Sequence, residues 1–535
     1  MIHNPILRGF HPDPSIIRVG EDYYIATSTF EWWPGVRLHH SKDLVKWELI
    51  EYPLNRVSQL DLRGVGPSQG VWAPCLTYCD GIFYLLYTVV TAFYCNMYDT
   101  NNYLVTAQDI HGPWSEPIPL NKFGFDPSLF HDEDGRKYVV SMATDHRVPK
   151  KYVGRLVLQE YDPVSQKMTG PIQDIYTADK IFLEGPHIFK RNGWYYLFAA
   201  DTGTGELHGQ SILRSRSVWG PYEMYQADFM RRDSDSEAWS ILTSRHCEEI
   251  LLQKAGHCDL VETPEGEWYA VHLCGRVLER EYSRRYPLGR ETAIQKMCWT
   301  EDDWLTLNYG GTAPQEIVPS PEGTPVSSPP EKHGFFDDFT RPELFLEYQS
   351  LRVPMTEQHL SLTERPGYLR MYGRSGLASK FSQSLIAVRL TEFDMEITTK
   401  LEFEPEVFKQ MAGLIMLYDT DNYFYLHISH DEDCGKCIAL LKAENKKYQY
   451  LTDYLPIPAG IPVELRAAAK NFCFTFSFRL EGGEWQEIAA DLDGSFLSDE
   501  ACAEGWFTGS MAGLCCQDLT GLGKYADFDW FKVKY

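Results

Sequence analysis

The sequence predicts an all-β protein, a five-bladed β-propeller followed by a β-sandwich. Three observations support this fold class: a hairpin pattern that recurs five times, a proline-rich break after it, and a second series of short strands. Aromatic residues make up 14% of the 535 residues, a share that suits strands more than helices. We therefore expect two β-domains.

Each of the five repeats starts with a polar or small residue, often next to proline, and continues into a short apolar run, a turn and an aromatic-rich strand. The turns mostly contain Asp-Gly or Asn-Gly, which favour tight hairpins. Successive repeats lie roughly 50 to 70 residues apart, the length of one four-stranded blade with its loops. Aligning the repeats makes five positions equivalent: Asp13, Ala73, Asp126, Gly185 and His257.

Three acidic residues fall at or next to these aligned positions. The innermost strand of each propeller blade begins near the central axis, so Asp13, Asp126 and Glu184 are expected to converge on one pocket. Like charges held close together repel and raise one another's pKa, so such a cluster costs stability and is typical of a catalytic site. The structural alternative is that each Asp-Pro caps a turn.

Three clustered carboxyl groups suit the hydrolysis of a glycosidic bond. This reaction needs one carboxylic acid that protonates the leaving oxygen and one carboxylate that activates water or attacks the sugar. Asp13 fits the base and Glu184 the acid, while a charge on Asp126 would keep Glu184 protonated. A non-catalytic sugar-binding propeller, which would stack sugars on tryptophans, has no need for three acids together.

A proline-rich segment divides the chain. We predict a propeller over residues 1–312, a linker over 313–332 and a concanavalin-like β-sandwich over 333–535. The expected strands of the second domain are 385–389, 393–400, 412–418, 423–429, 437–442, 463–468 and 472–478.

The net charge indicates which classes of binding partner the protein can have. The chain has 75 acidic and 50 basic residues, a net charge of −25, which repels nucleic acid and anionic lipid but not a neutral sugar. No basic segment followed by an apolar one opens the chain, so no signal peptide is expected. Thirteen cysteines without a repeated spacing indicate reduced thiols in a cytoplasmic protein. The sequence leaves open whether the protein forms a homo-oligomer.

Several motifs resemble the β-xylosidase branch of glycoside hydrolase family 43. They are His11-Pro12-Asp13-Pro14-Ser15, Ser28-Thr29-Phe30-Glu31-Trp32-Trp33-Pro34-Gly35, Gly70-Val71-Trp72-Ala73-Pro74, Gly124-Phe125-Asp126-Pro127-Ser128, Glu184-Gly185-Pro186-His187 and Pro287-Leu288-Gly289-Arg290-Glu291-Thr292. Two motifs of the second domain resemble the same branch: Arg365-Pro366-Gly367-Tyr368-Leu369-Arg370-Met371-Tyr372-Gly373-Arg374 and Phe507-Thr508-Gly509.

The resemblance implies an inverting, exo-acting β-D-xylosidase that releases xylose from the non-reducing ends of xylo-oligosaccharides. It implies Asp13 as general base, Asp126 as modulator of the pKa of the acid, and Glu184 as general acid. An α-L-arabinofuranosidase, or an enzyme with both activities, is the alternative, because both share these acids and differ in pocket shape.

The resemblance also assigns substrate-binding residues. Arg290 would bind sugar hydroxyls, Phe30 and Trp72 would form apolar walls, and Phe507 would close the pocket from the second domain. Each has a structural alternative, such as an ion pair or blade packing.

His257 would lie near the axis, where some family members hold a divalent cation, although an axis histidine held by hydrogen bonds is the alternative. One histidine without neighbouring oxygens is a poor cation site, so no cofactor or metal is expected.

Overall fold

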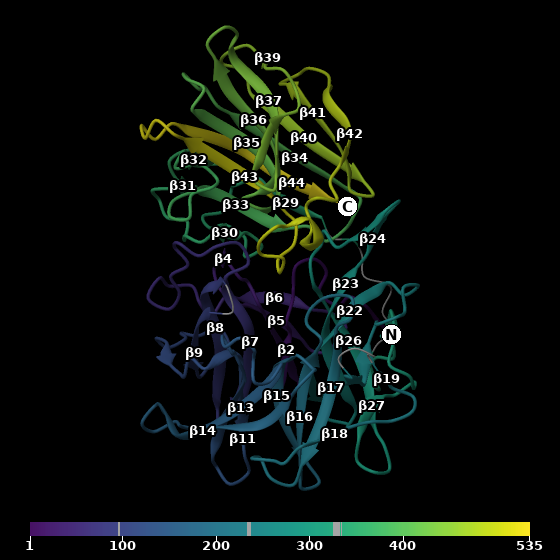
Figure 1. Ribbon diagram of the computed structural model, residues 1–535. Coiled ribbons are helices and arrows are strands. Elements are labelled where there is room, and N and C mark those ends of the chain that lie inside the picture. The colour runs from purple at the N-terminus through teal and green to yellow at the C-terminus, as the bar shows by residue number, and fades with distance from the viewer. Residues whose placement is uncertain (95–96, 233–236, 325–331, 333) are drawn as a thin grey trace.

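The computed structural model describes the 535-residue chain except residues 95–96, 233–236, 325–331 and 333 (Figure 1). Within this part, the chain forms strands, one 3-10 turn, η1 (Asp499–Ala501), and no α-helix. The described residues thus contain no long apolar helix of the kind that crosses a membrane. The predicted all-β class is confirmed.

Five antiparallel sheets form the propeller, which occupies the lower half of Figure 1. The first two blades are β2 (Ser15–Val19), β3 (Asp22–Thr27), β5 (Arg37–Ser41) and β6 (Glu48–Glu51), then β7 (Gly70–Cys79), β8 (Ile82–Tyr94), β9 (Met97–Ala107) and β10 (Ile118–Pro119). The third is β11 (Gly124–His131), β12 (Lys137–Ala143), β13 (Gly154–Asp162) and β14 (Lys167–Ala178). The fourth is β15 (Leu183–Arg191), β16 (Trp194–Asp201), β17 (Gly209–Ser215) and β18 (Glu223–Met224), with β21 (Leu242–Thr243) also on β17. The fifth is β22 (Leu252–Glu262), β23 (Trp268–Arg276), β26 (Glu291–Trp299) and β27 (Leu305–Leu307).

The five hairpins predicted from the repeats are the two inner strands of the five blades. They are β2–β3, β7–β8, β11–β12, β15–β16 and β22–β23. Turn residues with positive φ close them, including Asp80 and Asn192. The Asp-Gly and Asn-Gly pairs therefore set the hairpin register, as their chemistry predicts.

The second domain is a sandwich of two antiparallel sheets and confirms the concanavalin-like prediction. One sheet contains, in order, β31 (Leu360–Ser361), β32 (Leu369–Tyr372), β44 (Tyr525–Lys534), β34 (Met395–Glu402), β40 (Val463–Lys470), β41 (Cys473–Leu480) and β42 (Gln486–Asp493), with β29 (Phe335–Asp337) on β44. The other contains β33 (Ser384–Arg389), β43 (Met511–Asp518), β35 (Gln410–Asp419), β36 (Asn422–Asp431), β37 (Gly435–Glu444) and β38 (Lys447–Tyr450), with β39 (Leu455–Pro456) on β37. All seven strands predicted for this domain are present.

Backbone pairing also joins distant parts of the chain. β1 (Ile2–His3) pairs with β28 (Ile317–Val318), which holds the first part of the predicted linker against the propeller. Two further ribbons are β19 (Arg231–Arg232) with β20 (Trp239–Ser240) and β24 (Leu278–Arg280) with β25 (Ser283–Arg285). Residues 325–331 of the predicted linker, and residue 333, lie outside the described residues, and the exact domain limits stay a prediction.

The sandwich packs on one end of the propeller (Figure 1). β4 (Trp32–Trp33) of the propeller pairs with β30 (Ser350–Leu351) of the sandwich, so one small sheet crosses the boundary. One buried apolar cluster includes Phe30 and Trp72 from the propeller together with Ile415 and Tyr425 from the sandwich. A shared apolar core of this kind makes the two domains one packed unit.

Candidate active site

The floor of the site is built at the aligned starts of the blades. Asp13, Asp126, Gly185 and His257 all adopt left-handed backbone conformations, with φ between 53° and 56°. The inner strands of the second to fifth blades shift register near these positions, as β-bulges do. A bulge re-aims a side chain, and non-glycine residues with positive φ carry strain that is common at functional sites. The repeats therefore share a local backbone irregularity that directs these positions toward the axis.

Gly185 shows why one of these positions is glycine. A Cβ atom there would lie 2.6 Å from Nε2 of His257, so the histidine ring packs directly on the glycine backbone. The φ of 53° also favours glycine. Consequently the acidic residue of this blade is Glu184, one position earlier, whose longer side chain reaches into the same pocket.

All eight predicted site residues line one pocket. Three further residues, which were not predicted as site residues, complete the lining: Ala73, Phe125 and Thr204.

Asp13 has two strong donors. Nη1 of Arg290 lies 2.8 Å from its Oδ1, and the hydroxyl of Ser28 donates to its Oδ2 at 2.7 Å. Nδ1 of His257 lies 3.7 Å from Oδ1. These contacts suit a carboxylate, which accepts hydrogen bonds and gains from an adjacent cation.

Glu184 has the opposite surroundings. Its Oε1 is buried and has no hydrogen-bond partner within the described structure. Burial, and then the charges of Asp126 and Asp13, raise the pKa of Glu184 to about 8. Glu184 is therefore protonated at neutral pH and has an unused oxygen.

Asp126 lies between these two extremes. Its Oδ2 accepts a hydrogen bond of 3.0 Å from the backbone N–H of Gly185. Burial, and then the charge of Asp13, raise the pKa of Asp126 to about 7. Thus one residue pairs with a cation, one is neutral, and the third titrates near neutral pH.

The roof of the pocket comes from the sandwich. Phe507 lies on the loop between η1 and β43, and its ring stacks on Phe30 at a centroid distance of 5.9 Å. It also meets the edge of Trp72 at 5.4 Å. Nη2 of Arg290 donates to the carbonyl of Phe507 at 3.1 Å, so Arg290 joins the floor to the roof.

The guanidinium of Arg290 also lies beside two aromatic rings. Its Cζ lies 5.5 Å from the centroid of Phe30 and 5.3 Å from that of Phe507, both cation–π distances. Its Nε is buried without a partner, which leaves a donor for a ligand. Arg290 therefore can bind a sugar hydroxyl while it holds Asp13.

His257 is a buried axis histidine. Burial is the main cause that lowers its pKa to about 4, so the ring is neutral. No group of three potential metal ligands occurs among the described residues, and Asp13, the carboxylate near His257, already binds Arg290. The expectation that no metal binds stays a prediction.

Comparison with known proteins decides the family. The family model for glycosyl hydrolases family 43 matches residues 2–305, and the model for the beta xylosidase C-terminal concanavalin A-like domain matches residues 336–534. The chain belongs to glycosyl hydrolase family 43.

Relatives of known name align over the full chain. A beta-xylosidase of Bacillus subtilis is 42% identical over 100% of this chain and 99% of its own. A protein of Humicola insolens named xylosidase/arabinosidase 43B is 44% identical over 99% and 97% of the two chains. The crystal structure of a xylan beta-1,4-xylosidase from Bacillus halodurans is 46% identical, covers 100% of both chains and superposes with a TM-score of 0.94.

This family 43 site rests on a second polar layer that the sequence did not reveal. Nδ1 of His187 lies 2.9 Å from the hydroxyl oxygen of Ser128 and 4.0 Å from Oδ1 of Asp259. Burial alone would lower the pKa of His187, but Asp259 and neighbouring groups raise it to about 9. His187 is therefore a cation near Asp126. Its position three residues after Glu184 is the signal that could have identified it.

Proposed function

We propose that the protein is an inverting, exo-acting β-D-xylosidase that releases xylose from the non-reducing ends of xylo-oligosaccharides. The observation that carries this proposal is the unequal state of the carboxyl groups in one pocket. Glu184 is buried, protonated and has a free oxygen, whereas Asp13 accepts from Arg290 and Ser28. Acid–base hydrolysis of a glycosidic bond needs one group of each kind.

In the proposed mechanism, Glu184 donates its proton to the oxygen of the leaving sugar. Asp13 takes a proton from the water that attacks the anomeric carbon from the opposite face. Asp126 acts on Glu184 through its charge, which raises the pKa of the acid. Arg290 holds Asp13 in place and presents Nε to the substrate.

The aromatic roof of the pocket supports exo action. Phe507, Phe30 and Trp72 form apolar walls of the pocket that the three acids line. In this proposal, Phe507 blocks a chain that continues beyond the bound ring, so that only a terminal unit binds. The walls also exclude water from Glu184, which strengthens the electrostatics of the site.

An α-L-arabinofuranosidase activity is the second candidate. The name of the Humicola insolens relative, xylosidase/arabinosidase, favours it. Rates on the aryl β-D-xylopyranoside and the aryl α-L-arabinofuranoside, measured side by side, decide the preference. We expect a higher kcat/KM for the xyloside. A higher value for the arabinoside would reverse the assignment.

The stereochemical course tests the proposal directly. Proton NMR of xylobiose hydrolysis should show α-xylose as the first product from a β-linked substrate, because water attacks in a single displacement. A β-anomer first would require a covalent intermediate and would overturn the role of Asp13 as base. Glu184→Gln, which keeps the shape of the acid, is the control for background hydrolysis.

The remaining expectations are proposals of the same kind. Xylo-oligosaccharides are the proposed partners, and neither a metal nor another cofactor takes part in the proposed reaction. Cysteines from both domains, among them Cys75, Cys258 and Cys515, are free thiols, which supports the proposed cytoplasmic location.

A further inference from the structure

Two buried arginines lie at the boundary between the domains, one from each domain. Arg37 opens β5 of the propeller, and Arg389 closes β33 of the sandwich. Their exposed fractions are 4% and 6%. Arg389 donates twice to Oε1 of Gln349, which precedes the boundary-crossing strand β30. Two permanent charges are thus buried beside the ribbon that joins the domains.

Two other buried arginines, Arg245 and Arg276, have carboxylate partners. Arg245 lies 2.6 Å from Asp201, and Arg276 lies 2.8 Å from Glu291. Among the described residues, neither Arg37 nor Arg389 forms an ion pair with a carboxylate. Burying a charge without a counter-charge destabilises the folded state, so an arrangement of two such cations favours a bound anion.

Arg37, Arg389 and the nearby His39 each have a buried nitrogen without a hydrogen-bond partner. Nε of Arg37, Nη1 of Arg389 and Nδ1 of His39 are buried and have no partner within the described structure. His39 lies on β5 two residues after Arg37, and its ring meets that of His11 at a centroid distance of 5.0 Å. Three donors from the two domains are therefore left without an acceptor.

The electrostatic effects on Arg389 and His39 indicate that both groups lie near Arg37. Burial, and then the charge of Arg37, lower the pKa of Arg389 well below its usual value. Burial, Arg37 and Arg389 likewise lower the pKa of His39, so its ring is neutral and free to carry a proton on Nδ1. Tyr52, over which Arg37 lies at 5.7 Å, donates its hydroxyl to the carbonyl of Leu346 and offers no negative charge.

We propose that a small monovalent inorganic anion, a halide such as chloride, binds between the two domains at Arg37, Arg389 and His39. It would accept hydrogen bonds from the three unpartnered nitrogens and neutralise buried positive charge. A halide fits better than phosphate, because it needs no donor of its own and loses less hydration on burial. Nothing in the hydrolytic reaction uses this site.

The site lies directly behind the segment that carries Asp13. The ring of His11 packs on His39, and the backbone N–H of His11 donates to the carbonyl of Arg290 at 2.9 Å. An anion held here would tie the sandwich to the strand region of the first blade. It would thereby stabilise the relative position of the two domains.

A crystal of the full chain grown in sodium bromide tests the site directly. At the bromine absorption edge, we expect an anomalous peak in contact with Nε of Arg37 and Nη1 of Arg389. The peak should persist at low bromide concentrations, at which adventitious surface bromides are lost. A water molecule there without anomalous signal, or no density, would overturn the proposal.

Thermal unfolding gives a second test in solution. Above the Kd, the Tm should rise by about 1 °C for each tenfold increase in sodium bromide, compared with the bulky methanesulfonate at equal ionic strength. Arg389→Gln and Arg37→Gln should each abolish this dependence. Arg136→Gln removes the same charge from an exposed position and should keep it. A halide dependence that survives in both buried-site variants, or its absence in the unmodified protein, would refute the site. If neither variant folds, the bromide crystal alone decides.

Discussion

The floor and the roof of the pocket are built by different means. The floor places Asp13, Asp126 and Glu184 at the starts of blades, where each is held by its own sheet. The roof is one loop of the sandwich that carries Phe507 and docks on the propeller from outside. This difference indicates that the floor supplies the proton transfers, whereas the roof sets the shape of the pocket and excludes water.

The roof is positioned by close backbone contacts rather than by a sheet. A Cβ atom on Gly289 would lie 2.2 Å from the carbonyl oxygen of Thr508, so the two chains touch. The N–H of Phe507 donates to Oγ of Ser68 at 3.0 Å, and that of Ser510 donates to the carbonyl of Pro287 at 2.8 Å. The roof is therefore held by one close backbone approach and by single hydrogen bonds, each of which contributes little to its stability.

The largest effect should come from the floor. Asp13→Ala and Glu184→Ala should each lower kcat/KM on xylobiose by about 10³- to 10⁴-fold, because each removes one proton-transfer group. The two variants should differ on an aryl xyloside with a good leaving group. Glu184→Ala should recover much of its rate, since that leaving group needs no acid, and Asp13→Ala should not. Equal recovery of both would contradict the assigned roles.

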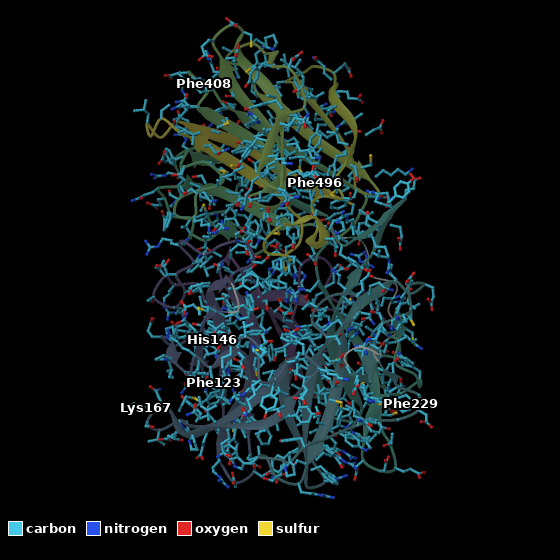
Figure 2. All side chains as sticks on the ribbon, in the orientation of Figure 1. Phe123, His146, Lys167, Phe229, Phe408 and Phe496 are labelled. Carbon is cyan, nitrogen blue, oxygen red and sulfur yellow. The ribbon has the colours of Figure 1, made fainter. Side chains whose placement is uncertain are left out.

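The next effect should come from the roof. Phe507→Ala should lower kcat/KM on xylobiose by about 10- to 100-fold, because Arg290 and the sugar lose an aromatic wall and water enters. The Tm should change little, as Phe507 is only half-buried. Phe408→Ala is the matched control: this phenylalanine of the sandwich, labelled in Figure 2, is 55% exposed and lies away from the site. A loss of stability without a loss of activity would remove the proposed role of the roof.

The same comparison separates what the sequence could predict from what it could not. The floor follows from repeats, because aligned Asp13, Asp126 and Gly185 share a conformation and a place in the blade. Seven sandwich strands were predictable from alternation and turns. The strands β43 and β44 were not predicted, although they lie inside the two sheets. β43 reads Met-Ala-Gly-Leu-Cys-Cys-Gln-Asp, without alternation, since it is buried throughout.

Contacts between segments that are far apart in the sequence are not predicted by any local sequence pattern. The ribbon of β4 with β30 and the donation from Arg290 to Phe507 join residues hundreds of positions apart. Only the resemblance of the motif around Phe507 placed this residue at the pocket. The unpaired Arg37 and Arg389 were likewise invisible, because an uncompensated buried charge becomes evident only when both domains are placed together.

A smaller effect should appear in the pH dependence. Asp126→Asn keeps an acceptor for the N–H of Gly185 but removes a charge that raises the pKa of Glu184. Because Glu184 must be protonated to act, activity falls as pH rises through its pKa of about 8. The basic limb of kcat/KM should therefore move to lower pH, by about one unit, as the rate falls. An aryl substrate that needs no acid is the control. An unchanged limb on xylobiose would leave Asp126 as a turn cap.

The smallest effect should come from the support of the roof. The hydroxyl of Tyr418 accepts a hydrogen bond of 3.1 Å from the N–H of Thr508 and donates to Asp499 at 2.6 Å. Tyr418→Phe should destabilise the protein by about 1–2 kcal/mol and raise KM a few-fold, because the neighbour of Phe507 loses its anchor. Tyr425→Phe is the matched control, since this buried hydroxyl donates to Cys515 and touches no part of the roof. It should lower the Tm similarly and leave KM unchanged. If both variants raise KM equally, the roof responds to the stability of the whole sandwich rather than to its own anchor.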